Sequence, residues 1–189
     1  MRPEPGQVLH FSEDPTITRF VPHVVAGAPR PEAYVWAVDA DRAPDYWFPR
    51  DCPRAMAWAT AETTEADRAH ILGPGGGDRV HAIEYGWLGA LQAVRLFAYR
   101  LPAASFEPFD GPVSHAHVAT RPVEPLGPAE PAGDLLALHE EAGIQLRLLP
   151  GLWPFWDTVI TSSLGFSGIR LRNARPRLEL SAPSRPHPR

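Results

Sequence analysis

A single stretch of the chain, residues 33–54 (AYVWAVDADRAPDYWFPRDCPR), constrains the fold more than any other, because it combines a strand, a turn and the wall of a small-ligand pocket. Residues 34–38 are β-branched, aromatic and small apolar side chains, a composition that predicts a strand. Asp39 and Asp41 follow at once, and aspartate is a good cap for the short helix expected at APDYWF. Aromatic residues then alternate with arginines and acids, a mixture that suits a polar cleft better than a core. We therefore expect a ligand cleft beside this segment.

The length and charge of the chain limit its domain number and its partners. The 189 residues are enough for one domain with a full core. The chain has 18 basic and 22 acidic residues, a net charge of −4, and no basic face, which argues against a nucleic-acid partner. No apolar run suggests export or membrane insertion, so we expect a cytoplasmic protein without a membrane partner. The expected partner is a small anionic or neutral ligand.

Two residue types exclude whole classes of chemistry. All 18 basic residues are arginine, and without lysine there is no Schiff base, pyridoxal phosphate attachment or P-loop lysine. Cys52 is the only cysteine, which excludes an internal disulfide and a multi-cysteine metal site. Cys52 becomes a nucleophile if Arg50 and Arg54 lower its pKa, whereas the usual role of a lone cysteine is that of a small buried side chain.

Hydrophobic patterning predicts an α+β domain over residues 1–173. Strands are expected at residues 7–11, 34–38, 55–59, 79–85, 94–101, 113–120, 144–149 and 169–171. Helices are expected at residues 62–72, 87–92, 135–141 and 155–162. Beyond residue 173 the chain is rich in Pro, Arg and Ser with little to bury, so residues 174–189 are expected to form a disordered tail.

The run RDCPR contains the most specific polar pattern. Arg50 and Arg54 are four residues apart and always charged, so they can form a fork for a phosphate or carboxylate, with Asp51 orienting one guanidinium. The alternative is an Arg–Asp salt bridge that holds the proline-containing turn. Both interpretations stay open at this point.

Other polar residues are weaker candidates. His115 and His117 alternate onto one face of a predicted strand, but two ligands do not make a metal site, and no metal site is predicted. Glu84 on a predicted strand is a candidate general base, and its alternative is a solvated strand glutamate.

Four strings in the chain carry a family resemblance. LHFSEDPTITRF, VWAVDADRAPDYWFPRDCPR, FAYRLPAASFE and FSGIRLRNA resemble a family of uncharacterised bacterial proteins of similar length, the DUF6886 family. The resemblance covers nearly the whole chain. It implies no particular reaction, because none is established for that family.

A second resemblance concerns the fold. A strand ending in His, a capped turn and an aromatic strand are similar to the ADP-ribosyltransferase-like fold, which holds NAD in a cleft between two halves of a split, mostly antiparallel sheet. The resemblance implies that His10 contacts the adenosine ribose and that Ser12 lies near the nicotinamide amide. It also implies that Tyr34 or Trp36 stacks on the nicotinamide ring.

The third motif of that fold departs from the family pattern in this chain. The motif usually ends in a Glu that stabilises the oxocarbenium-like transition state, and here Ser114, or at best His115, stands in its place. Glu84 or Asp51 is then the candidate substitute for the missing carboxylate.

Two function classes follow from these residues. The first is an enzyme that transfers or hydrolyses ADP-ribose from NAD or a related nucleotide, with Glu84 or Asp51 as the catalytic carboxylate. The second is a non-catalytic module that binds a small ligand or a protein through Arg50 and Arg54. A carboxylate inside the cleft favours the enzyme, and arginines without an acid favour the binding module.

Overall fold

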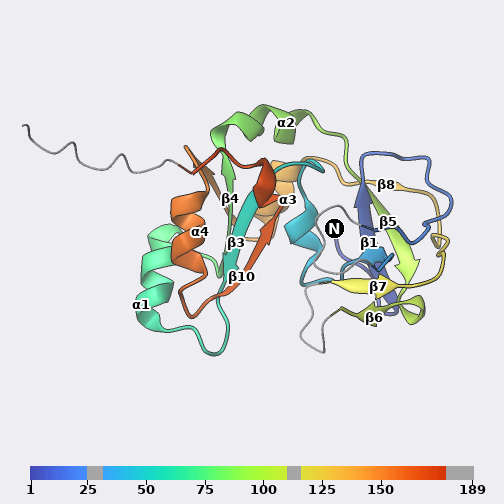
Figure 1. The fold of residues 1–189 in the computed structure, drawn as a ribbon, viewed down its shortest axis with the longest axis horizontal. Helices are drawn as coiled ribbons and strands as arrows, with labels where there is room; N and C mark the ends of the chain where they lie inside the picture. Colours follow the sequence, from blue (N-terminus) through green and yellow to red (C-terminus); the bar gives the residue numbers. More distant parts are fainter. Residues whose placement is uncertain (25–31, 110–115, 178–189) are drawn as a thin grey trace, which may run out of the picture.

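Strands fall into two groups that form the two halves of the molecule (Figure 1). The structure is a computed structural model, and it describes residues 1–24, 32–109 and 116–177. One half holds two three-stranded sheets, with the orders β1 (Gln7–Ser12), β5 (Phe97–Pro102), β8 (Glu130–Pro131) and β2 (Val35–Ala37), β7 (His117–Ala119), β6 (Glu107–Pro108). The other half holds one four-stranded sheet, with the order β10 (Gly165–Ile169), β3 (Arg54–Trp58), β4 (Arg79–Glu84), β9 (Gln145–Leu149).

Pairing between the strands is mostly antiparallel, as predicted, and the α+β class is confirmed. Among the described strands only β4 and β9 pair in parallel. The two small sheets are joined where the backbones of Leu9 and Val38 exchange two hydrogen bonds of 2.8 Å. An apolar cluster that includes Ile83, Leu96 and Leu135 continues from one half into the other, so the halves form one domain.

Burial explains the strand composition in each half. In the larger sheet, β3 and β4 are buried along almost their whole length, although Arg54, His81 and Glu84 stand among their apolar residues. α4 (Trp153–Val159) packs Val159 against Ala57 and Val80 on one face. In the other half, Tyr99 and Phe20 pack edge to face with ring centroids 5.1 Å apart.

Helices are short, and their ends follow local capping rules. Asp134 caps α3 (Leu135–Glu141) by accepting hydrogen bonds from two backbone N–H groups, and Gly143 at φ +66° follows its end. The other helical elements are α1 (Glu65–Asp67) with its π-helical continuation η2 (Arg68–Leu72), α2 (Leu88–Ala93), and the 3-10 turns η1 (Ala43–Tyr46), η3 (Gly73–Gly75), η4 (Tyr85–Trp87), η5 (Ala103–Ser105) and η6 (Leu171–Asn173). No helix within the described ranges combines the length and the apolar character that a bilayer crossing needs.

The last strand differs most from its prediction. Residues 169–171 were expected to form it, but β10 begins at Gly165 and ends at Ile169. Glycine is a poor strand former, yet space requires it here: a Cβ on Gly165 would meet the Trp58 indole at 2.2 Å. Of the strand expected at residues 113–120, residues 113–115 lie outside the described residues.

Two smaller differences concern helix starts. Thr64, not a residue near 62, caps the first helix by accepting from the Asp67 N–H. Of the two aspartates before η1, Asp39 is the one whose carboxylate accepts backbone hydrogen bonds, and the donors are the N–H groups of Asp41 and Arg42. Asp41 therefore does not act as the predicted cap.

The end of the described chain is bound to the domain. The N–H of Arg175 donates to both carboxylate oxygens of Glu84, at 3.0 and 3.2 Å, and its carbonyl accepts from Trp153 Nε1 at 2.7 Å. Arg177 pairs with Asp157. The ordered domain thus extends at least to residue 177, beyond the predicted boundary at 173, and residues 178–189 of the predicted tail lie outside the described residues.

Candidate functional site

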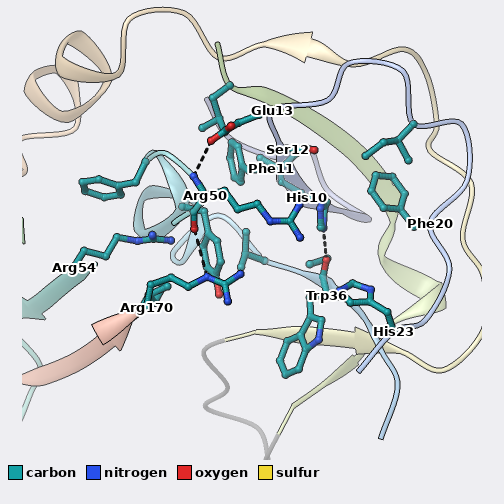
Figure 2. A pocket seen from close by; sticks show the side chains of 18 of the residues that line it. His10, Phe11, Ser12, Glu13, Phe20, His23, Trp36, Arg50, Arg54 and Arg170 are labelled. Atoms are coloured by element: carbon teal, nitrogen blue, oxygen red, sulfur yellow. Dashed lines mark hydrogen bonds between the residues drawn. The ribbon is translucent and has the colours of Figure 1, made fainter. Parts of the chain in front are cut away.

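A cavity of about 580 Å³ lies between the two halves of the molecule (Figure 2). Residues of β1 and β2 form one wall, and residues 46–54 together with residues 168–172 form the opposite wall. Its volume lies in the range of small-molecule sites, about 300–1,000 Å³. His10, Ser12, Trp36, Arg50 and Arg54, which the sequence singled out, all line it.

His10 offers the cavity a hydrogen-bond acceptor. Its Nδ1 lies 2.7 Å from the carbonyl oxygen of Trp36, and since a carbonyl only accepts, Nδ1 carries the proton. Burial lowers the pKa of His10, opposed by the Trp36 carbonyl and reinforced by the charges of Arg50 and His23. The ring is therefore neutral at neutral pH, and Nε2 keeps its lone pair. One ring face is occupied by Phe20, with centroids 4.7 Å apart.

The structure separates the two aromatic residues that the sequence left as alternatives. Trp36 lines the cavity, whereas Tyr34 lines a second hollow of about 300 Å³ beside Phe109. The three rings form a cluster, with Trp36 and Phe109 centroids 4.8 Å apart. The Nε1 of Trp36 is buried and has no hydrogen-bond partner among the described residues.

The end of β1 connects the first wall to the second. Ser12, 8% exposed, accepts a hydrogen bond from the Asp14 N–H at 3.1 Å, and its own hydroxyl proton remains to be donated. Glu13 accepts a hydrogen bond of 2.8 Å from the backbone N–H of Arg50. This contact holds the arginine-bearing turn against the strand that carries His10.

Arg54 is the most unusual residue of the cavity. It is 3% exposed, and no carboxylate of the described chain forms a salt bridge with it. Its Nε donates to the carbonyl oxygen of Asp45 at 2.7 Å and its Nη1 to that of Cys52 at 3.0 Å. The guanidinium lies over the rings of Tyr46 and Phe48, 5.5 and 5.1 Å from their centroids. The salt bridge expected as an alternative role is therefore not formed by Arg54.

The turn that carries Arg50 is fixed by the C-terminal segment. Asn173 donates through Nδ2 to the carbonyl oxygen of Asp51 at 2.8 Å, and Arg170 donates through Nε to that of Arg50 at 3.4 Å. Arg170 has φ +55° and is the only non-glycine residue of the described chain with a positive φ. A left-handed arginine is a strained choice, and such strain concentrates at functional sites.

Arginines predominate among the charged residues of the described chain that line the cavity. The lining includes 5 arginines, which are Arg19, Arg50, Arg54, Arg170 and Arg172. Among the described residues Glu13 is the single carboxylate that lines it. A low-dielectric wall concentrates this positive field, so the cavity favours an anion.

The two predicted catalytic carboxylates do not line the cavity. Glu84 is 2% exposed on β4, where it accepts hydrogen bonds from the N–H groups of Leu152 and Arg175. Neither the general-base role nor the solvated position suits this environment, since the buried Glu84 carboxylate accepts backbone hydrogen bonds from two other segments of the chain. Asp51 is exposed, and the carbonyl of its backbone is the group that makes a contact.

Cys52 has the character of a buried structural residue. Burial raises the pKa of its thiol to about 12, although the charge of Arg54 acts in the opposite direction. The thiol is therefore protonated at neutral pH and donates to the Pro53 carbonyl at 3.6 Å. Cys52 therefore has the usual role of a lone cysteine, that of a small buried side chain.

The predicted histidine pair is only partly described. His117 lies 3.3 Å from Asp39 (Nε2 to Oδ2), while Ser114 and His115 lie outside the described residues. Within the described ranges, no three His, Cys, Asp or Glu side chains come together in a way that could hold a metal ion.

Sequence reasoning missed Glu13, Arg19, Arg170 and Arg172 as cavity residues. The string FSGIRLRNA carried a resemblance to the family, but the predicted strand placed Arg170 in regular β structure. The residues next to Arg170 in the sequence gave no sign of its left-handed backbone.

Comparison with known proteins identifies a family without an assigned activity. A family model described as a family of unknown function, DUF6886, matches residues 9–174, so the chain belongs to this family and the predicted resemblance is confirmed. No curated protein and no solved structure matches the chain.

Proposed function

We propose that this member of the DUF6886 family binds a phosphate-bearing nucleotide, such as NAD or ADP-ribose, in the cavity between its two halves. The phosphate contacts Arg54 and Arg50, and the sugar and ring extend toward His10 and Trp36. This arrangement is the one that the ADP-ribosyltransferase-like resemblance implies, with the phosphate contacts added.

The observation that carries the proposal is the unpaired charge of Arg54. A buried guanidinium costs several kcal/mol of lost hydration unless an opposite charge compensates for it. Carbonyl oxygens of Asp45 and Cys52 hold Arg54 in place but bring no negative charge. An anionic ligand would supply that charge, and the held guanidinium would lose little side-chain entropy on binding.

The opposite wall supports a sugar and a ring rather than an inorganic anion alone. His10 presents an acceptor suited to a hydroxyl or amide donor, and Trp36 is an aromatic residue of the same wall. A lone-pair acceptor and an aromatic residue offer little to a bare phosphate, which needs hydrogen-bond donors. They suit a ligand that carries donors and acceptors on a flat or hydroxylated body.

A catalytic role is the second candidate, and one residue favours it. Hydrolysis or transfer of ADP-ribose needs a carboxylate near the anomeric carbon to stabilise positive charge. Glu84 and Asp51 lie off the cavity, whereas Glu13 lines it between Ser12 and the arginine turn. Replacing Glu13 therefore tests whether the cavity is catalytic.

A ligand panel tests binding. Thermal unfolding is followed with NAD, ADP-ribose, adenosine and inorganic phosphate, and a ligand at 100 times its Kd stabilises by about 2.7 kcal/mol. For a chain of this size that is a rise in Tm of roughly 5–10 °C. We expect ADP-ribose and NAD to stabilise and adenosine to fail, because it lacks phosphate. Equal shifts with adenosine and ADP-ribose would contradict the anion site.

Matched variants assign the effect to the cavity. Arg50→Gln removes a cavity charge from an exposed side chain, and Arg121→Gln removes the same charge at an exposed position outside the cavity. We expect the ADP-ribose shift to fall only in Arg50→Gln. For the catalytic candidate, release of nicotinamide from NAD by the wild type and its loss in Glu13→Gln, with ADP-ribose binding retained, would establish the enzyme.

A further inference from the structure

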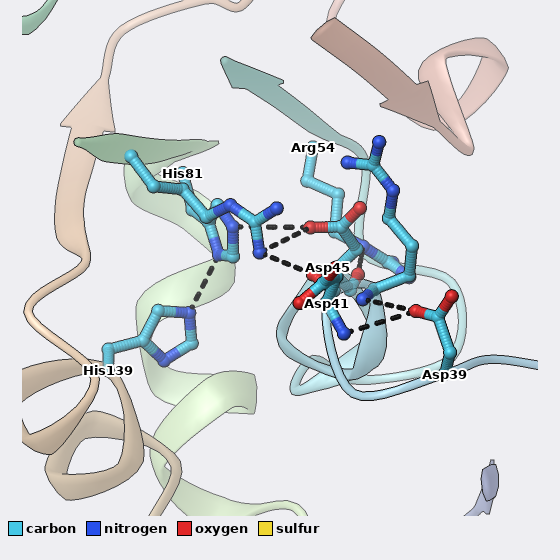
Figure 3. Close-up of polar contacts among 8 residues, drawn as sticks. Asp39, Asp41, Asp45, Arg54, His81 and His139 are labelled. Atoms are coloured by element: carbon cyan, nitrogen blue, oxygen red, sulfur yellow. Dashed lines mark hydrogen bonds and ion pairs between the residues drawn. The ribbon is translucent and has the colours of Figure 1, made fainter. Parts of the chain in front are cut away.

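Behind the cavity wall, three buried side chains from three elements form a continuous polar chain (Figure 3). Asp45 lies in η1, His81 in β4 and His139 in α3, and each is at most 2% exposed. His139 Nδ1 lies 2.7 Å from the Leu135 carbonyl oxygen, His139 Nε2 lies 3.1 Å from His81 Nδ1, and His81 Nε2 lies 3.4 Å from Asp45 Oδ1. The candidate site uses none of these groups directly.

The proton positions in this chain follow from its first contact. The carbonyl of Leu135 only accepts, so Nδ1 of His139 carries a proton and Nε2 of a neutral His139 carries a lone pair. That lone pair accepts from Nδ1–H of His81. A neutral His81 then has a lone pair on Nε2, and this lone pair faces the carboxylate of Asp45.

The third contact therefore lacks a proton when both histidines are neutral. The two atoms lie 3.4 Å apart, and neither His81 Nε2 nor Asp45 Oδ1 has a hydrogen-bond partner among the described residues. One more proton, on His81 or on Asp45, would complete the chain and cancel the carboxylate charge. The chain therefore has a two-proton state with a net negative charge and a neutral three-proton state.

Arg54 connects this chain to the cavity. The carbonyl oxygen of Asp45 accepts from Arg54 Nε, and Phe48, beneath the guanidinium, packs against the rings of His81 and His139. In the two-proton state the Asp45 carboxylate offsets part of the positive field at Arg54. In the three-proton state that offset is lost, and the cavity attracts an anion more strongly.

We propose that Asp45, His81 and His139 are positioning residues that form a proton-binding chain behind Arg54, so that an anionic ligand binds more tightly when the chain takes up its third proton. The statement about affinity rests on the proposed function, whereas the coupling of the chain to Arg54 does not. Binding of the anion and uptake of the proton are reciprocal, because each favours the same state.

The other charged groups around the chain set when the proton enters. Arg42 precedes η1, Arg79 lies on β4 with its Nη1 3.7 Å from Asp45 Oδ1, and Tyr46 follows Asp45. Burial lowers the pKa of His81, although Asp45 opposes this, and the positive charges of Arg79 and Arg54 lower it further. The third proton therefore enters at a pH below the ordinary histidine value near 6.5.

Two variants hold the chain in opposite states. Asp45→Asn supplies an amide N–H to His81 Nε2 and removes the carboxylate charge, which imitates the three-proton state. His81→Gln removes the titrating ring and keeps the carboxylate, which imitates the two-proton state. Burial also lowers the pKa of His10, which lines the cavity itself, so His10→Gln is the control for that histidine.

Calorimetry with ADP-ribose measures the affinity at about pH 7.5 and about pH 5, because its diphosphate does not titrate in that range. We expect wild type to bind on the order of tenfold more tightly at the lower pH, the effect of one unit charge at roughly 10 Å and a dielectric constant of about 20. Asp45→Asn should bind tightly and His81→Gln weakly at both values, while His10→Gln keeps the pH dependence. Loss of the dependence in His10→Gln alone would overturn the proposal.

A second readout needs no ligand. The Nε–H resonance of Arg54 in the free wild-type protein should shift with pH at the midpoint of the His81 ring and stay constant in Asp45→Asn. If ADP-ribose does not bind but this shift is present, the proposed function fails and the coupling stands. If ADP-ribose binds and Arg54 does not respond to the His81 titration, the proton-binding chain is refuted.

Discussion

Replacing Arg54 by lysine keeps the charge and removes the fork. The guanidinium reaches two carbonyl oxygens at once, those of Asp45 at 2.7 Å and Cys52 at 3.0 Å. A lysine ammonium is a point donor on a differently shaped stem and reaches one of them at best. At least one buried carbonyl is then left without its donor.

The size of the effect follows from these contacts. Hydrogen bonds from a charged donor contribute about 1.5–3 kcal/mol each, so we expect Arg54→Lys to lower the free energy of unfolding by about 2–4 kcal/mol. Urea unfolding gives the value, with an unchanged m-value showing that only stability has changed. Arg121→Lys, an exposed control, should stay within about 0.5 kcal/mol. A loss for Arg54→Lys no larger than that of the control would refute the two-carbonyl fork.

Three further predictions concern stability. Ending the chain after Asn173 should cost about 1–3 kcal/mol, because the buried Glu84 carboxylate loses a backbone donor, whereas a chain ending at residue 177 should match wild type in urea unfolding. Burial lowers the pKa of His139 to about 4, so the stability that its neutral form provides is present above the ordinary value near pH 6.5 and is lost as pH falls; the loss of stability between about pH 7 and about pH 5 should be smaller by about 2 kcal/mol in His139→Gln than in wild type. Gly165→Ala should lower Tm by the equivalent of about 1–3 kcal/mol, since its Cβ would meet Trp58 at 2.2 Å, and an unchanged Tm would show that the strand can move away.

Local signals in the sequence predicted the elements that local interactions determine. The helix after Asp134 was placed correctly because its cap and the glycine at residue 143 act within one turn of the helix ends. The strand of His10 was placed correctly because it carries a regular run of strand-forming side chains. By contrast, β10 begins with a glycine that only its neighbour Trp58 explains.

The candidate site divides in the same way. Arg50, Arg54 and Trp36 were found because one continuous segment carries them all, and that segment forms much of a cavity wall. Arg170 was missed because its place in the cavity depends on a crossover that brings residue 170 beside residue 50. Patterns along the chain do not show that residues 50 and 170 lie side by side.

Glu84 shows the opposite error. A glutamate on a predicted strand indicated either a base or a solvated residue, and the sequence held no sign that residue 175 would return to it. The polar chain behind Arg54 was missed for the same reason, because its three members are 36 and 58 residues apart along the chain. Both are tertiary arrangements of residues that look ordinary in sequence.

The position of a bound phosphate tests the central claim most directly. A crystal structure with ADP-ribose should place a phosphate oxygen within about 3.2 Å of a guanidinium nitrogen of Arg54 or Arg50, with the ribose and ring on the side of His10 and Trp36. Density for the diphosphate in the second hollow beside Tyr34, or on the surface away from the arginines, would contradict the account.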